Sequence, residues 1–203
     1  VPLLREAISY VAHTAIRTRG TIGGNVAHAD PSAEIPTVLV ALGGEIVAAS
    51  SNGDRAIPAK DFFLGAFLTE LDEREIVKLI RIPKEEKNSG SAFVEFSPRH
   101  GDFAIVGIAA VISQNDSGHT DSVRLVAAGV DGKPLDLSSE ADSLLGKENL
   151  TLDSFDEVAQ NVFKRVEPGG DIHASEDFRR ELSQTLTVKA LGLAWKRLGG
   201  SYE

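Results

Sequence analysis

A glycine-rich stretch constrains the fold of this chain more than any other feature: Arg17-Thr-Arg-Gly-Thr-Ile-Gly-Gly-Asn-Val-Ala-His-Ala-Asp-Pro-Ser-Ala-Glu34. Gly23 and Gly24 lack a Cβ atom, so the backbone there can adopt positive φ and turn its N–H groups toward a ligand. Thr21 and Asn25 flank these glycines with a hydroxyl and a carboxamide, which can bond a phosphate or ribose oxygen. The stretch therefore indicates either an anion-holding loop or an ordinary glycine turn, and glycine content by itself favours the turn.

The end of this stretch carries signals for the start of a helix. Asp30 is a good N-cap, and Pro31 suits the first helical position. We expect the apolar run 35–42 to form a buried helix that is kinked or restarted at Pro36 and ends at Gly43-Gly44. Free backbone N–H groups at its start would then lie close to the glycine-rich stretch.

His28, Asp30 and Glu34 form a cluster of possible metal ligands. A helix that begins at Asp30 would place the two carboxylates, four residues apart, on one face. This combination of residue types and spacing matches no established metal signature, so we predict no metal site. Ser32 has His28 nearby in the sequence, but nothing orients the histidine, and we predict no catalytic residue in this chain.

Composition limits the partners and cofactors. The 203 residues carry a formal net charge of −9 and no cysteine. The negative charge argues against binding to nucleic acid or anionic membranes, because a phosphate backbone is normally met by a Lys/Arg patch. Without cysteine the chain cannot ligate an iron–sulfur cluster through thiolates, so such a relay requires another polypeptide. No run approaches the ~18 apolar residues of a membrane span, and no signal peptide is evident, so we expect a cytoplasmic protein.

The remaining pattern indicates an α+β protein in two parts. We expect a helix over 2–15, strands over 45–49, 55–58, 75–82, 91–96, 104–113 and 122–129, and helices over 139–145, 152–166 and 175–198. The charged segment 84–90 has no apolar residue and is the best linker, so we place a domain boundary there. The sequence contains no methionine and begins abruptly at Val1 within a helical pattern, from which we expect it to be a fragment without its upstream part.

The stretch Thr21-Ile22-Gly23-Gly24-Asn25, continued by residues 27–34, resembles the second flavin-binding signature of a known family. The family is that of the FAD-containing medium subunits of molybdenum hydroxylases, the group of aerobic carbon monoxide dehydrogenase and xanthine dehydrogenase. Later blocks are similar to the same family in the same order, at residues 61–65, 75–83, 99–106 and 171–180. The resemblance covers nearly the whole chain and is far more specific than the glycine motif.

The resemblance implies a fold and a set of site residues. Residues 1–83 would be the second lobe of a split FAD-binding (PCMH-type) domain, and residues 91–203 a small α+β domain with an antiparallel sheet and helices on one face. Glu34 would lie beside the ribose and pyrophosphate region of FAD, Val77 would touch the flavin, and Glu95 stands where some relatives have a flavin-contacting lysine. The full set of implied FAD-binding residues is Thr21, Ile22, Gly23, Gly24, Asn25, His28, Asp30, Glu34, Val77 and Glu95.

The resemblance also implies a role in electron transfer. In this family a large subunit oxidises the substrate at a molybdopterin site, a small subunit passes electrons through two [2Fe-2S] clusters, and FAD on the medium subunit delivers them to an external acceptor. An earlier glycine-rich signature of the family is not among these 203 residues. Two alternatives remain: a flavoenzyme like the reductase acting on UDP-N-acetylenolpyruvoylglucosamine, or an assembly subunit that has lost its flavin.

Overall fold

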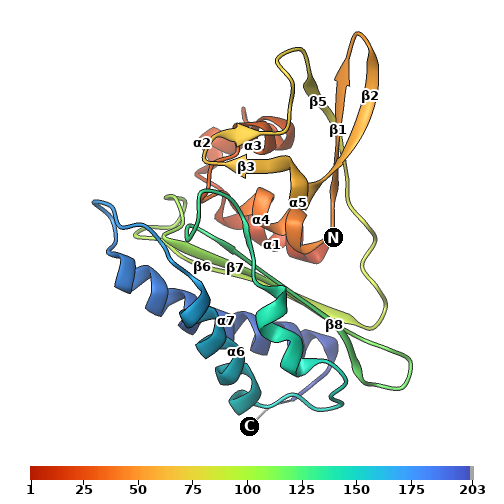
Figure 1. The fold of residues 1–203 in the computed structure, drawn as a ribbon, viewed down its shortest axis with the longest axis vertical. Helices are drawn as coiled ribbons and strands as arrows, with labels where there is room; N and C mark the ends of the chain where they lie inside the picture. The colour runs from red at the N-terminus through yellow and green to blue at the C-terminus, as the bar shows by residue number, and fades with distance from the viewer. Residues whose placement is uncertain (202–203) are drawn as a thin grey trace.

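The computed structural model describes residues 1–201 and shows three layers of secondary structure (Figure 1). The N-terminal helices and a small sheet lie above a four-stranded sheet, and two long helices cover the lower face of that sheet. This arrangement confirms the α+β class. No helix within residues 1–201 is long and apolar enough to cross a membrane.

The N-terminal part runs from the first helix to the fifth strand. Its elements are α1 (Pro2–Tyr10), α2 (Thr14–Arg17), α3 (Ile22–His28), α4 (Glu34–Ala41), β1 (Glu45–Ser50), β2 (Gly53–Pro58), α5 (Ala59–Phe62), β3 (Phe63–Gly65), β4 (Leu68–Thr69) and β5 (Ile76–Arg81). The expected hairpin is present, because β1 pairs with β2 antiparallel and Ser50 lies opposite Gly53 at the turn. Strand β5 pairs on the other side of β1, so the sheet order is β2-β1-β5.

The C-terminal part contains the second sheet and its helices. Its elements are β6 (Ser89–Phe96), β7 (Val106–Gln114), β8 (Thr120–Ala128), β9 (Leu135–Asp136), the 3₁₀-helix η1 (Ser138–Leu144), α6 (Leu152–Arg165) and α7 (Glu176–Leu198). All its strands pair antiparallel in the order β6-β7-β8-β9. The three long strands and the three helical segments match the sequence-based expectation closely.

Both faces of the β6–β8 sheet are apolar and covered. Successive residues of a strand point to opposite faces, and on β6 Val94 belongs to the core formed with α6 and α7. Its neighbour Phe93 belongs to a different cluster, with Leu3 and Ala7 of α1 and with residues of α4. The helices of the C-terminal part therefore lie on one face, as predicted, while α1 and α4 cover the other face.

The predicted helix over 2–15 is wrong in its second half. Helix α1 ends at Tyr10, Ala12 has a φ of 44°, and α2 restarts at Thr14. The Arg17 guanidinium donates to the carbonyls of Val11 and Ala12. These hydrogen bonds satisfy carbonyl groups that the interruption leaves without helical partners, which is why an amphipathic pattern can break here.

The predicted start of the next helix is also wrong. Helix α4 begins at Glu34, and Asp30 is not its cap: the Asp30 Oδ1 atom accepts the N–H of Ser32 at 2.8 Å in a tight turn. Pro36 consequently falls in the first helical turn, where the backbone N–H has no intrahelical acceptor to lose. The kink expected at Pro36 is therefore absent, and α4 ends before Gly43, which has a φ of 64°.

Two further details differ from the expectation. The cap of α7 is confirmed, since the Ser175 hydroxyl accepts the N–H of Phe178, but Phe178 is 39% exposed and does not extend the buried stripe.

Strand β6 begins at Ser89, inside the segment expected to be a linker. A Cβ atom on Gly90 would lie 2.1 Å from the carbonyl oxygen of Ala194, so α7 can cross β6 this closely only at a glycine.

Phe93 tests the contact between the two parts. Its side chain is fully buried against α1, with the Tyr10 ring at a centroid distance of 5.7 Å. Because Phe93→Ala would leave a cavity between sheet and helix, we expect it to lower the free energy of unfolding by about 3–5 kcal/mol in urea titrations. Phe103, which is 74% exposed, is the matched control, and Phe103→Ala should change stability by less than about 0.5 kcal/mol. Equal effects of the two variants would contradict this packing.

Candidate functional site

The glycine-rich stretch forms a capped helix rather than a loop. Thr21 is the N-cap of α3, and its hydroxyl accepts the N–H of Gly24 at 2.9 Å. Gly23 and Gly24 lie within the helix and are not among the glycines with positive φ, so that expectation is wrong. The side chain of Thr21 fixes the start of the helix, which explains why two glycines are helical here.

Helix α3 packs against β5 and so brings two predicted regions together. A Cβ atom on Gly23 would lie 3.8 Å from Cγ1 of Val77, which is half-buried on β5. Asn25 follows on the same short helix, and its Oδ1 atom is buried without a hydrogen-bond partner. The structure therefore places Val77 beside Gly23, although 54 residues separate them in the sequence, and Asn25 lies two residues further along the same helix; we call this region the cradle.

Two buried acidic residues come from different parts of the chain. Glu34, at the start of α4, is 6% exposed, and both carboxylate oxygens of Glu95 on β6 are buried without a hydrogen-bond partner. Burial raises the pKa of Glu34 to about 7, and the charge of Asp30 acts in the same direction. Burial, followed by the charge of Glu34, raises the pKa of Glu95 to about 8. The two carboxyl groups are thus close enough to influence each other.

His28 and Asp30 have local contacts instead of a shared ligand. The His28 ring packs on the Phe67 ring at 5.0 Å, and the Phe67 N–H donates to the Ala29 carbonyl at 2.9 Å. These contacts hold the β3–β4 hairpin against the end of α3. Within residues 1–201 no group of three His, Cys, Asp or Glu side chains is arranged to hold a metal ion.

Arg179 is a residue of this region to which the sequence analysis assigned no role. It is 7% exposed, and its Nη1 atom donates to the carbonyls of Ile105 at 2.6 Å and Gly129 at 3.0 Å. Its Nη2 atom donates to Asp171 at 2.6 Å, and the Gly129 N–H donates to the Pro31 carbonyl at 3.0 Å. Arg179 therefore supports the turn before Glu34 through Gly129. The 171–180 block was the only signal in the sequence that pointed to it.

Gly129 is required at this junction for a physical reason. Its φ is 77°, and a Cβ atom there would lie 2.4 Å from the Ile105 carbonyl oxygen. Only glycine combines the left-handed conformation with such a close approach. The pairing of Gly129 with Pro31 therefore connects the C-terminal sheet to the turn that precedes α4.

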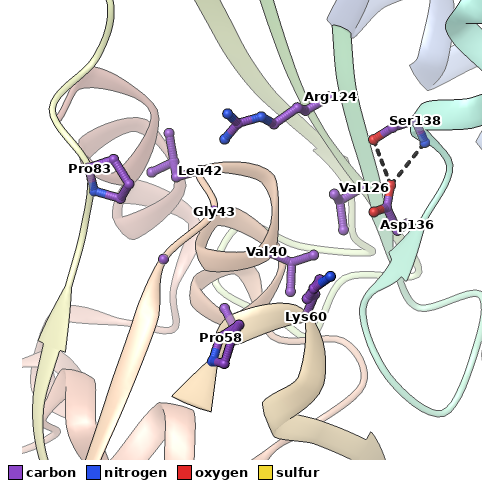
Figure 2. Close-up of a pocket in the computed structure, with 12 residues that line it drawn as sticks. Val40, Leu42, Gly43, Pro58, Lys60, Pro83, Arg124, Val126, Asp136 and Ser138 are labelled. Carbon is purple, nitrogen blue, oxygen red and sulfur yellow. Dashed lines mark hydrogen bonds between the residues drawn. The ribbon is translucent and has the colours of Figure 1, made fainter. Parts of the chain in front are cut away.

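A separate cavity of about 440 Å³ lies at the opposite end of α4 (Figure 2). Lys60 and Arg124 line it, and Arg124 donates to the Ala41 carbonyl at 3.3 Å. Asp136 is occupied by Ser138, whose N–H and hydroxyl both donate to its Oδ1 atom, as the dashed lines in Figure 2 show. None of the predicted site residues lines this cavity, so we assign the candidate site to the cradle at the other end of the helix.

Arg179 offers a direct test of the support beneath the cradle. Arg179→Met would leave the buried carbonyls of Ile105 and Gly129 without a donor, so we expect a loss of roughly 2–4 kcal/mol in the free energy of unfolding. Arg74 is the control, because its side chain is exposed, and Arg74→Met should cost less than about 0.5 kcal/mol. Urea titrations of both variants measure the difference, and a similar loss in both would argue against the anchoring role.

Comparison with protein families finds two matches that together span most of the chain. Residues 1–85 match the FAD binding domain in molybdopterin dehydrogenase, and residues 91–194 match the CO dehydrogenase flavoprotein C-terminal domain. The two matched regions meet near the charged segment between β5 and β6.

Individual proteins agree with these matches. The chain is 34% identical to the 6-hydroxypseudooxynicotine dehydrogenase complex subunit alpha of Paenarthrobacter nicotinovorans, over 97% of this chain and 66% of that protein. It is 33% identical to the carbon monoxide dehydrogenase medium chain of Hydrogenophaga pseudoflava, over 97% of this chain and 68% of that protein. The chain thus spans about two thirds of the length of the curated relatives that it matches.

Solved structures show the same fold. The structure of carbon monoxide dehydrogenase from Hydrogenophaga pseudoflava lacking the Mo-pyranopterin moiety superposes with a TM-score of 0.91 at 32% identity, over 97% of this chain and 68% of that chain. Quinoline 2-oxidoreductase from Pseudomonas putida 86 gives 0.88 at 33% identity, over 98% of this chain and 67% of that chain. From its sequence, its two matched domains and its fold, the chain belongs to the family of FAD-binding medium subunits of molybdenum hydroxylases.

Proposed function

We propose that this chain holds FAD in the cradle between α3, β5, the start of α4 and the end of β6, and that it serves as the electron-transferring medium subunit of a molybdenum hydroxylase. The observation that carries the proposal is the packing of Gly23 on α3 against Val77 on β5, 54 residues later in the sequence, with the Asn25 Oδ1 atom of the same helix buried and without a hydrogen-bond partner. The match to the FAD binding domain over residues 1–85 supports it.

The unpartnered atoms of the cradle fit the chemistry of FAD. The Asn25 Oδ1 atom and the two Glu95 oxygens are buried acceptors that need donors, and the ribityl and ribose hydroxyls of FAD are donors. At the start of α3, the N–H groups of Ile22 and Gly23 have no intrahelical acceptor, so they are available to a phosphate oxygen. We therefore assign Thr21, Ile22, Gly23, Gly24, Asn25, His28, Asp30, Glu34, Val77 and Glu95 to the FAD site.

The role of the protein in this proposal is to bind FAD and to orient it. When bound, FAD accepts electrons and passes them to an external acceptor, and the chemistry belongs to the cofactor. The apolar contact between Gly23 and Val77 excludes water from one wall, and Glu34 and Glu95 set the charge of another. No side chain of the cradle needs to act as a catalytic acid or base for this function.

The partners follow from what this chain lacks. It has no cysteine, so electrons from a molybdenum site must reach the flavin through [2Fe-2S] clusters on a small subunit, with the molybdopterin on a large subunit. The relatives include subunits of multi-subunit dehydrogenases, which supports this assembly. We propose the same two partners here.

We further propose that residues 1–83 and 91–203 are the two domains, joined by 84–90. The separation of the three-stranded sheet from the four-stranded sheet and the boundaries of the matched regions support this division. The match over residues 91–194 favours the molybdenum hydroxylase family over a reductase acting on UDP-N-acetylenolpyruvoylglucosamine.

Gly24 tests flavin binding. It is exposed at the start of α3, and Gly24→Val would fill the space that the cofactor needs, so we expect the full-length protein to lose its bound FAD. Gly169→Val is the control, because nothing lies within 4 Å of a Cβ atom at that position. The measurement is the ratio of flavin to protein after purification. A folded, fully yellow Gly24→Val protein would contradict the site, and a colourless wild-type protein would favour an assembly subunit without flavin.

The source of the electrons is tested by omission of the partners. The isolated full-length medium subunit should bind FAD yet keep its flavin oxidised when mixed anaerobically with N-heterocycles, aldehydes or carbon monoxide. Addition of the small and large subunits should then allow a substrate of the complex to bleach the flavin absorption. Bleaching by substrate without partners would show a self-sufficient flavoenzyme instead.

A further inference from the structure

Two buried carboxyl groups from different parts of the chain lie near enough for the charge of one, Glu34, to act on the other, Glu95. Glu34 starts α4, whereas Glu95 lies near the end of β6, on the same face of the strand as Phe93. That face packs against the N-terminal helices. Glu34 is 6% exposed, and both oxygens of Glu95 are buried. Two coupled carboxylates with so little access to water are costly to bury unless one carries a proton.

Within residues 1–201, no cation is found to act on either carboxyl group. The charges that act on them are acidic: Asp30 acts on Glu34, and Glu34 acts on Glu95. Tyr10 on α1 also feels the charge of Glu95, which contributes to raising the pKa of the Tyr10 hydroxyl after burial and the charge of Glu6. The nearby Arg197 is already paired with Glu6 at 2.7 Å. The charge of Arg197 is therefore already paired with that of Glu6.

Hydrogen bonds do not compensate Glu95 either. The hydroxyl of Ser97 is the one neighbour that acts to lower the pKa of Glu95, but it donates its hydrogen to the Arg99 carbonyl at 3.1 Å. Opposite Glu95 on β7 lies Gly107, which has no side chain to donate. A carboxylate in this place would have neither a donor nor a counter-ion, whereas a neutral carboxylic acid is far less costly to bury.

We propose that Glu34 and Glu95 form an acid pair that holds at least one proton at neutral pH, so that this wall of the FAD cradle carries one negative charge rather than two. The part of this inference that concerns FAD binding rests on the proposed function. FAD is itself an anion through its diphosphate, and a second carboxylate in the cradle would weaken its binding. Glu95 is thus a positioning residue that keeps the cradle compatible with an anionic cofactor.

The first experiment needs no cofactor and measures stability against pH. A carboxyl group whose folded-state pKa lies above its unfolded value near 4.5 stabilises the fold fully below that value, and this contribution is lost as pH rises toward about 8. Glu95→Gln keeps the shape of the neutral acid. Its midpoint of urea unfolding should therefore rise relative to wild type between pH 5 and pH 8.5. Glu34→Gln should behave in the same way.

Glu157 on α6 provides a matched control, since it is exposed and Glu157→Gln changes the net charge equally. The difference in urea-unfolding midpoint between Glu157→Gln and the wild type should stay constant across the same pH range. A constant difference for Glu95→Gln and Glu34→Gln as well would overturn the acid pair. If one of these two variants does not fold, the other decides the question.

The second experiment measures the Kd for FAD of the full-length protein. Between pH 7 and pH 9 the wild-type Kd should increase, by at most about tenfold for each pH unit if one proton is linked to binding. For Glu95→Gln the Kd should change less than about twofold over this range. An equal pH dependence in both proteins would overturn the effect on FAD. Absence of FAD binding by the wild type would instead reject the proposed function, while the stability experiment would still decide the acid pair.

Discussion

The structure depends on a sheet that is apolar on both faces. Strands β6, β7 and β8 place Val94, Ile108 and Leu125 against α6 and α7, and they place Phe93 and Val126 against α1 and α4. A sheet of this kind is stable only when both faces are kept from water, since burying a side chain of this size contributes about 1.5–3 kcal/mol. The second cover comes from the N-terminal part. This need joins the N-terminal and C-terminal parts into one packed molecule.

The position of α4 on the sheet determines where chemistry is possible. The charge of its first residue, Glu34, reaches Glu95 near the end of β6, and the carbonyl of its last residue, Ala41, accepts a hydrogen bond from Arg124 on β8. The apolar contacts in between, such as Val38 with Phe93, offset the unfavourable burial of the two acids. Arg179 and Gly129 hold the turn before α4 at Pro31. The region around Glu34 is therefore built on rigid elements, and the burial of its acids is tolerated because packing elsewhere is strong.

Local sequence signals predicted most elements and misplaced their ends. The strands of the second sheet and the cap at Ser175 are as predicted, because alternation and capping are local properties. The errors lie at Ala12 and Asp30, where Arg17 and Ser32 supply hydrogen bonds that compete with a continuous or an earlier helix. Such competition depends on the geometry of the turn and leaves no periodic trace in the sequence.

The sequence alone determined the family, the order of the elements and the absence of any thiolate ligand, because motifs, hydrophobic periodicity and composition depend only on the type and order of the residues. Only the tertiary structure decided that Val77 lies beside Gly23, that Arg179 supports Pro31 through Gly129, and that the charge of Glu34 reaches Glu95. Burial, charge coupling and unpartnered atoms arise from distances between segments that lie far apart in the chain. No local pattern encodes those distances, since they follow from the way both faces of one sheet are covered.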